Sequence, residues 1–125
     1  MSDRARALIA AYNDAWNRQD LAAVCSFHDT SIVFENHSAG ERAEGSDAVR
    51  EHIAGIFERW PSLRFSSRRL YAADSFVVSE WTARAVRADG VEIEWEGVDV
   101  FPLRHDKILR KDVYSTSHAP RIVVT

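Results

Sequence analysis

Asp99 is the residue of this chain whose surroundings most clearly indicate chemistry. It stands between Val98 and Val100 in a segment rich in apolar side chains. A carboxyl group in such a setting either has a charged partner or is held protonated, because burial disfavours its charge. Both states suit the transfer of a proton to or from a small molecule. The alternative is a structural ion pair with Arg84 or Lys111 that closes the core.

Alternation along the strands predicts which side chains share a face with Asp99. Residues two apart on a strand point to the same side of the sheet, so Trp95 and Phe101 are expected beside Asp99. On the neighbouring strand, the same face is expected to carry Glu80 and Arg84. For these two residues the alternative is an ion pair on the protein surface.

The last strand has two alternative registers. Either Lys111 and Val113 or Asp112 and Tyr114 share the face of Asp99. A bulge of one residue would exchange the two sets. The uninterrupted register favours Lys111 and Val113.

Three residues outside these strands are further candidates. Tyr12 lies on the apolar stripe of a helix, where a tyrosine can equally belong to the core. Asn36 follows a strand and either acts on a ligand or makes a local turn bond. His37 titrates near neutral pH, and the alternative is a solvated histidine in a loop. The aromatic residues expected to line an apolar cavity or the core are Trp16, Phe34, Phe57, Trp60, Trp81 and Trp95.

The remaining reactive side chains form no recognisable site. The five histidines show no metal-ligand spacing, so no metal is expected. The five glycines include no phosphate-binding loop, and no cofactor is expected. Cys25 lies beside Val24 on a short helix, without a nearby His or Asn pattern, which favours a packed thiol over a nucleophile.

Length and charge exclude several classes of protein. The 125 residues suffice for a single domain over residues 1–125. Sixteen Lys and Arg against nineteen Asp and Glu give a net charge of −3, which argues against nucleic acid as a partner. No apolar run approaches the roughly 18 residues of a membrane span, and the N-terminus does not resemble a signal peptide. We therefore expect a cytoplasmic protein that has no membrane partner.

Periodicity predicts that the first half of the chain is mainly helical. Apolar residues three and four apart indicate a helix over residues 5–16, a short helix after Asp20, and a third over residues 46–60. Residues 32–35 are expected to form a short strand. Residues 36–45, rich in glycine and charge, are expected to form a loop.

The second half is predicted to be sheet. Segments rich in β-branched and aromatic residues indicate strands over residues 63–73, 76–87, 91–103 and 107–116. Tight turns are expected at residues 88–90 and at His105-Asp106. The tail from Ala119 is an extra strand or a loose end. Three helices followed by antiparallel strands indicate an α+β fold, with helices on one face of a curved sheet.

Three stretches carry a resemblance to a known family. They are Tyr12-Asn-Asp-Ala-Trp-Asn-Arg-Gln-Asp20-Leu, then Gly45-Ser-Asp-Ala-Val-Arg-Glu-His-Ile, then Trp95-Glu-Gly-Val-Asp99-Val-Phe101 with Asp106-Lys-Ile108 and Asp112-Val-Tyr114. In this order they resemble the cone-shaped nuclear transport factor 2-like fold, in its SnoaL-like and ketosteroid-isomerase-like branch, over residues 5–118. The resemblance implies three N-terminal helices on a strongly curved, mainly antiparallel sheet. It also implies a homodimer formed through that sheet.

The resemblance implies roles for three residues. In ketosteroid isomerases, a tyrosine on the first helix and a protonated Asp on a late strand stabilise an oxyanion, and an Asp after the first strand is the base. Tyr12 and Asp99 match the first two positions. Asn36 stands at the position of the base but has no useful basicity. The base is therefore expected to be His37, Glu80 or a water held by Asn36.

Two other branches of the family differ from this chain at their catalytic positions. In limonene epoxide hydrolases, an Asn that Asn36 matches helps to hold the attacking water. Their Asp-Arg-Asp set on the sheet is not reproduced, because Glu80 and Thr82 stand at two of its positions. Polyketide cyclases often end the late strand in Tyr-x-Asp, where this chain has Tyr114-Ser115-Thr116.

Three kinds of function therefore stay open. An isomerase, cyclase or lyase would act on a hydrophobic carbonyl compound by acid–base chemistry. A binding module would hold an apolar or amphipathic ligand without chemistry, and a scaffold would use the sheet face alone. The expected catalytic residues are Asp99, Tyr12 and Asn36. The expected substrate-binding residues are Trp16, Phe34, His37, Phe57, Trp60, Glu80, Arg84, Trp95, Phe101 and Lys111.

Overall fold

The computed structural model describes residues 2–124, and these begin with three helices. The helices are α1 (Ser2–Asn17), α2 (Leu21–Ser26) and α3 (Ser46–Arg59). Asp20 is the N-cap of α2, where its carboxylate accepts a hydrogen bond of 3.1 Å from the Ala23 backbone N–H. The three predicted helices are confirmed. None of the described helices has the length and apolar character needed to cross a bilayer.

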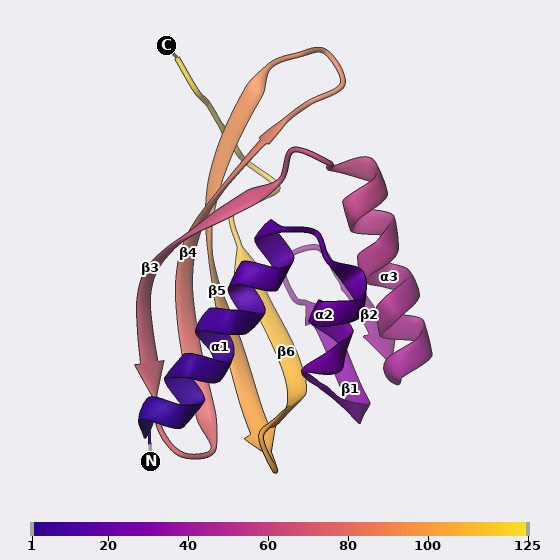
Figure 1. Cartoon of the computed structure of the whole chain (residues 1–125). Coiled ribbons are helices and arrows are strands. Elements are labelled where there is room, and N and C mark those ends of the chain that lie inside the picture. The colour runs from indigo at the N-terminus through magenta and orange to yellow at the C-terminus, as the bar shows by residue number, and fades with distance from the viewer. Residues whose placement is uncertain (1, 125) are drawn as a thin grey trace.

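Seven strands form one sheet that curls beside the helices (Figure 1). They are β1 (His28–Asn36), β2 (Glu41–Glu44), β3 (Arg64–Ala72), β4 (Phe76–Val86), β5 (Glu92–Arg104), β6 (Lys107–Ser115) and β7 (Arg121–Ile122). The strand order is β2-β1-β6-β5-β4-β3, and β7 pairs with β5. β1 and β6 run parallel, whereas the other pairs are antiparallel. The predicted α+β fold with a mainly antiparallel sheet is confirmed.

The segment between β1 and α3 differs from the prediction of a loop. Glu41–Glu44 form the short edge strand β2, which pairs with the end of β1 from Val33↔Glu44 to Asn36↔Glu41. Its sequence is almost entirely charged, so it lacks the apolar alternation that predicts a strand. Backbone hydrogen bonds to β1 hold this strand in place. The pattern of its side chains does not indicate that such bonds form.

The predicted tight turns of the second half are confirmed. His105 and Asp106 have φ angles of 52° and 62°, the left-handed backbone of a two-residue hairpin between β5 and β6. Gly90 has a φ angle of 86° in the turn between β4 and β5. The tail forms the two-residue strand β7.

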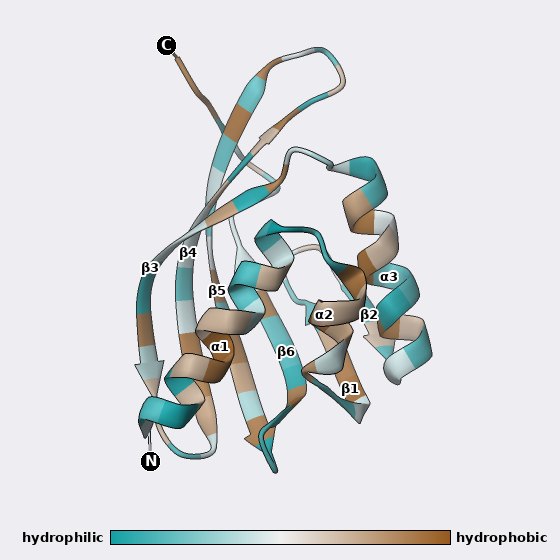
Figure 2. Ribbon diagram, viewed as in Figure 1, coloured by the Kyte–Doolittle hydropathy of each residue, from teal (hydrophilic) through white to brown (hydrophobic). Residues whose placement is uncertain are grey.

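The register between β4 and β5 decides which residues face the helices. Ser79 pairs with Asp99 and Trp81 pairs with Gly97, so the odd-numbered residues of both strands face inward and are buried or line the interior. Figure 2 shows that hydrophobic and hydrophilic residues follow one another along these strands. The expectation for even-numbered β4 residues was therefore one position out of register.

Glu80 and Arg84 consequently lie on the outer face of the sheet, so the prediction that they face the pocket is wrong. Arg69 Nε donates to Glu80 Oε1 at 2.8 Å, and Arg84 Nε donates to Glu94 Oε2 at 2.7 Å. The last strand follows the favoured register: Lys111 is 6% exposed and inward, whereas Tyr114 is 49% exposed on the other face.

Gly97 is the position at which close packing on the sheet is most easily tested. A Cβ there would lie 2.3 Å from the ring of Trp81, its partner across β4 and β5. We expect Gly97→Ala to displace this ring, to lower the free energy of unfolding by about 1–3 kcal/mol, and to shift the tryptophan fluorescence. Urea unfolding followed by circular dichroism and fluorescence measures both effects.

The matched control is Gly55→Ala in α3. A Cβ at Gly55 meets only the flexible end of Arg59, at 4.0 Å. This substitution is expected to raise the stability by up to about 1 kcal/mol, because alanine favours a helix. Equal effects of the two substitutions would contradict the close contact at Gly97.

Candidate functional site

The space between the helices and the sheet holds two adjoining hollows of about 230 and 310 Å³. The smaller hollow lies along α1 and β3, and the larger one reaches to α3, β1 and the start of β5. Both are lined by the same central group, which is Trp16, Phe65, Trp81, Asp99 and Lys111. We call the two hollows together the cavity, and its most chemically distinctive groups are the acid and the amine at their junction.

Asp99 on β5 and Lys111 on β6 form a buried pair. Asp99 is directly opposite Val113, so Lys111, two residues away on β6, shares its face. Lys111 Nζ lies 3.5 Å from Asp99 Oδ2, and the two residues are 6% and 4% exposed. Of the two partners expected for Asp99, the structure places Lys111 beside it and Arg84 on the opposite face.

Four aromatic rings surround the ammonium group of Lys111. Its Nζ lies 4.3, 4.9, 5.2 and 5.6 Å from the ring centroids of Trp16, Tyr12, Phe101 and Phe34, respectively. Aromatic faces attract a cation, and the attraction is stronger away from water. Trp16 and Phe34 belong to the cavity wall, whereas Tyr12 and Phe101 are fully buried.

Burial moves the two pKa values of the pair in opposite directions. Desolvation raises the pKa of Asp99, and the charge of Lys111 opposes that rise. Desolvation lowers the pKa of Lys111, and the charge of Asp99 opposes that fall. These shifts bring the charged pair, carboxylate and ammonium, closer in free energy to the neutral pair, carboxylic acid and amine. The two forms differ only in whether one proton lies on Lys111 or on Asp99. Such a pair can both accept and donate a proton.

Three buried polar atoms at the junction have no hydrogen-bond partner among the described residues. They are Asp99 Oδ1, Trp16 Nε1 and Trp81 Nε1. Trp81 lies close enough to Asp99 to favour its charged form, yet its indole nitrogen makes no hydrogen bond. All three residues line the cavity, so one acceptor and two donors beside it are unsatisfied by the described residues.

Tyr12 lies behind the cavity rather than in its wall. Its hydroxyl is 2.9 Å from Nε2 of His28, the first residue of β1. Burial raises the pKa of Tyr12, while burial and then the charge of Lys111 lower the pKa of His28 to about 4. Both side chains are thus neutral at neutral pH. Sequence reasoning gave His28 no role, because nothing local indicates that the start of β1 meets α1.

Asn36 and His37 have different positions although they are neighbours. Asn36 lines the larger hollow, and its side-chain oxygen accepts a 3.3 Å hydrogen bond from the Ala39 N–H. His37 faces the other way: its Nε2 donates to Asp112 Oδ1 at 2.9 Å, and its ring stacks on Tyr114 with centroids 4.4 Å apart. The structure therefore brings Asn36, but not His37, to the cavity.

The predicted aromatic residues divide into two groups. Those that line the cavity are Trp16, Phe34, Trp60, Trp81 and Trp95. Phe57 packs edge-on against Trp16, and Phe101 packs edge-on against Tyr12, so both support the wall from behind. Phe65 on β3 is a lining residue that the sequence did not indicate, because β3 is mostly exposed and lacks a regular apolar pattern.

One group of described residues has the spacing of a metal site, but it lies outside the cavity. Carboxylate and imidazole atoms of Glu35, His37 and Asp112 lie within 4.8 Å of one another. Arg110 donates to Asp112 at 2.8 Å and to Glu35 at 3.3 Å, so a guanidinium already supplies the positive charge that these carboxylates need. This arrangement is a surface ion-pair network.

A curled sheet closed by three helices over an aromatic-lined cavity is the architecture of nuclear transport factor 2-like domains. Within this class, the family model of the SnoaL-like domain matches residues 9–111, and the chain belongs to that family. Among curated proteins, none matches the chain.

Several solved structures share the fold. A candidate polyketide cyclase from Xanthomonas campestris pv. campestris is 25% identical, with a TM-score of 0.77 and 90% of each chain covered. An LEH-like epoxide hydrolase from M. tuberculosis is 17% identical, with a TM-score of 0.80 over 94% of this chain and 86% of the other. TerC, co-crystallised with polyporic acid, is 16% identical, with a TM-score of 0.79 over 88% and 89%. The last two likenesses show the fold alone.

The coupling of Asp99 and Lys111 can be measured by a double-mutant cycle. Lys111→Met leaves a buried carboxylate without its counter-charge and is expected to cost about 3 kcal/mol or more of stability. This loss of stability should grow as the pH rises. The unfolded chain releases the Asp99 proton at a lower pH than the folded variant, in which burial raises the pKa of Asp99, so a rising pH favours unfolding. Asp99→Asn combined with Lys111→Met should cost less than the sum of the single changes. Additive losses in urea unfolding would contradict the pairing.

The burial of His28 leads us to expect that the protein loses stability in mild acid. Its pKa is lowered from 6.5 to about 4 on folding, so the unfolded chain takes up the proton first as the pH falls between these values. The folded state should lose up to about 3 kcal/mol over this range relative to a His28→Gln variant. Thermal unfolding of both proteins at a series of pH values measures the difference. Parallel pH profiles would show that His28 is not buried in its neutral form.

Proposed function

We propose that this protein is an enzyme that moves a proton on a small, hydrophobic carbonyl compound bound in the cavity. The observation that carries the proposal is the free oxygen of Asp99. This Oδ1 is buried, lacks a hydrogen-bond partner among the described residues, belongs to a residue that lines both hollows, and sits on a carboxyl group 3.5 Å from an ammonium. A buried acid of raised pKa in a cavity is a general acid–base candidate.

The charges of the pair suit proton abstraction next to a carbonyl group. Asp99 takes a proton from the carbon beside the carbonyl, and the negative charge passes from the carboxylate to the substrate oxygen. During this proton transfer the nitrogen of Lys111 carries a positive charge, so it stabilises the carboxylate first and the enolate afterwards. Return of the proton to another carbon completes an isomerisation or starts a ring closure. The base of this reaction is then Asp99 itself, which differs from the bases expected from the sequence.

The walls of the cavity favour an apolar substrate with few polar groups. Trp60, Trp95 and Phe65 supply flat apolar surface. The indole N–H groups of Trp16 and Trp81 have no hydrogen-bond partner among the described residues, and in this proposal they donate to a substrate oxygen. Asn36 offers its amide at the wall of the larger hollow. In this proposal Asp99 and Lys111 are the catalytic residues.

Tyr12 has a supporting role in this proposal. Its hydroxyl is engaged with His28, and its ring lies 4.9 Å from the ammonium of Lys111. It therefore acts as a positioning residue for the amine. The similarity to a candidate polyketide cyclase supports small-molecule chemistry as the general class.

A binding module without chemistry is the second candidate function. The observation that favours it is Asn36. This neutral amide stands where related enzymes have a basic carboxylate, and its side-chain oxygen already accepts a hydrogen bond from the turn that follows β1.

The homodimer and the cytoplasmic location stay predictions. A second copy on the outer sheet face would cover Val98, Val100 and the half-exposed Tyr114.

The test uses hydrogen exchange in small aromatic ketones. Binding is detected by quenching of the cavity tryptophans, and turnover by NMR as deuterium enters the carbon beside the carbonyl. We expect Asp99→Asn to retain ligand quenching and to lower the exchange rate by about 100-fold or more, the contribution of a positioned base. The control Glu80→Gln, on the outer face, should exchange at the wild-type rate. Quenching without exchange in the wild-type protein would favour the binding module.

A further inference from the structure

We infer that Lys111 is also a nucleophile, which forms a covalent imine with an aldehyde or ketone that enters the cavity. The inference concerns the site of the proposed function and adds to it a covalent mode of carbonyl activation. Three independent features support it: the kind of cation at this position, the rings around it, and the acid beside it.

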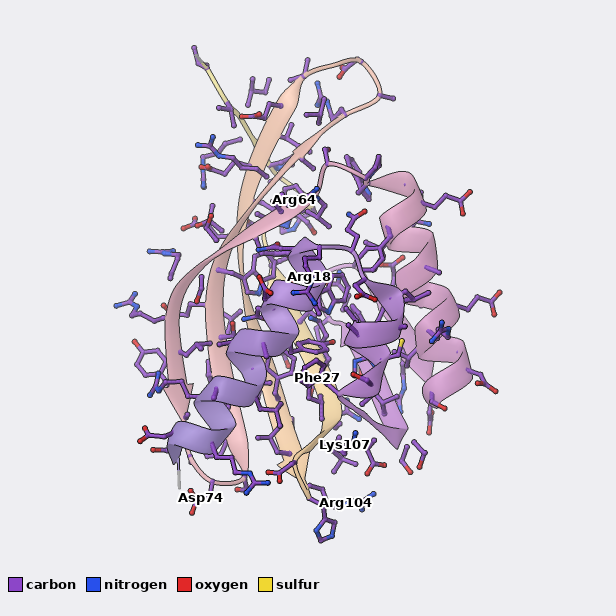
Figure 3. The ribbon with its side chains drawn as sticks, in the orientation of Figure 1. Arg18, Phe27, Arg64, Asp74, Arg104 and Lys107 are labelled. Atoms are coloured by element: carbon purple, nitrogen blue, oxygen red, sulfur yellow. The ribbon has the colours of Figure 1, made fainter. Side chains whose placement is uncertain are left out.

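The choice of cation is the first feature. Of the sixteen basic residues only Lys107 and Lys111 are lysines, and the others are arginines. A guanidinium stays charged in proteins and cannot attack a carbonyl, whereas an amine can lose its proton and do so. Lys107 is the first residue of β6 and is exposed (Figure 3). Its Nζ donates to the Ser26 carbonyl at 2.7 Å. Although arginine is the common cation of this chain, the buried cation that faces the cavity is a lysine, whose amine can act as a nucleophile.

The arrangement of the rings is the second feature. Tyr12 and Phe101 are fully buried behind the amine, and Trp16 and Phe34 stand beside it in the cavity wall. Lys111 itself lines both hollows, so a ligand in either hollow lies against this side chain, and the inferred reaction joins its carbonyl carbon to Nζ. Burial lowers the pKa of Lys111 and so increases the share of the free amine.

The position of Asp99 is the third feature, because imine formation needs a proton acceptor and donor next to the amine. Lys111 first passes a proton over 3.5 Å to Asp99. The free amine then attacks the carbonyl carbon, the C–N bond forms, and the nitrogen proton moves to the oxygen to give a carbinolamine. Asp99 returns its proton as the C–O bond breaks. Ammonium and carbonyl thereby become a protonated imine and one water, and Asp99 ends as a carboxylate.

The site suits the product as well as the starting ammonium. The protonated imine carries the same single positive charge on the same nitrogen, among the same rings and beside the same carboxylate. The step therefore creates no new buried charge, which would be costly in this setting. A protonated imine also makes the neighbouring C–H bond more acidic. The Asp99 carboxylate, which the proposed function makes the proton acceptor, stands beside this bond.

Reductive trapping tests the inference. The protein is incubated with benzaldehyde and cyanoborohydride near neutral pH, so that hydride adds to the imine carbon and fixes it as a benzyl amine. Intact mass and peptide mapping then locate the label. Of the two lysines, we expect Lys111 to carry a benzyl group and Lys107 to carry little, and we expect the Lys111 label to be lost when an aromatic compound without a carbonyl group fills the cavity. A label on Lys107 and none on Lys111 would overturn the inference.

Variants separate this reaction from general lysine labelling. Lys107→Arg removes the exposed lysine and should leave the cavity label unchanged. Lys111→Arg keeps the charge and should abolish that label. Because the competition between two lysines is measured in the wild-type protein, the result does not depend on whether Lys111→Arg folds. Proton exchange without a Lys111 label would overturn the inference alone, and a Lys111 label without exchange would overturn the proposed function alone.

Discussion

A carboxylate and an ammonium group buried side by side are the constraint around which this fold is organised. Taking either charge out of water costs several kcal/mol, and in the interior only the other charge and the surrounding ring faces repay that cost. Asp99 and Lys111 stand 3.5 Å apart with Lys111 Nζ within 5.6 Å of four aromatic centroids. Loss of either member leaves the other uncompensated, so the stability of the sheet depends on both.

The first helix seals this pair from water. Tyr12 and Trp16 are one helical turn apart on α1, and both rings lie against the amine. The contact between Tyr12 and His28 ties the same helix to the start of β1. Since β1 pairs with β6, which carries Lys111, the helix, the parallel strand pair and the amine form one connected unit. Burial of this kind strengthens the electrostatic interaction between the acid and the amine.

The fold was largely predictable because its elements have strong local signals. Helical periodicity and the Asp20 cap indicated the helices, and alternation with tight turns indicated the strands of the second half. The exceptions have physical causes. Glu41–Glu44 are charged and owe their strand to backbone pairing with β1. Glu80 and Arg84 were expected on the inner face because alternation reveals two faces but not which one is inner, and the pairing of Ser79 with Asp99 reverses the assignment.

The sequence by itself determined the α+β class, the acid on an apolar strand, and the wealth of aromatic side chains available for a cavity. Only the tertiary structure decided that Lys111 and not Arg84 faces Asp99, that Tyr12 meets His28, and that Asn36 and His37 point to opposite sides. The physical reason is that these contacts depend on strand register and on the parallel pairing of β1 with β6. Such pairing joins residues about 77 positions apart, through backbone hydrogen bonds that every residue type except proline can make.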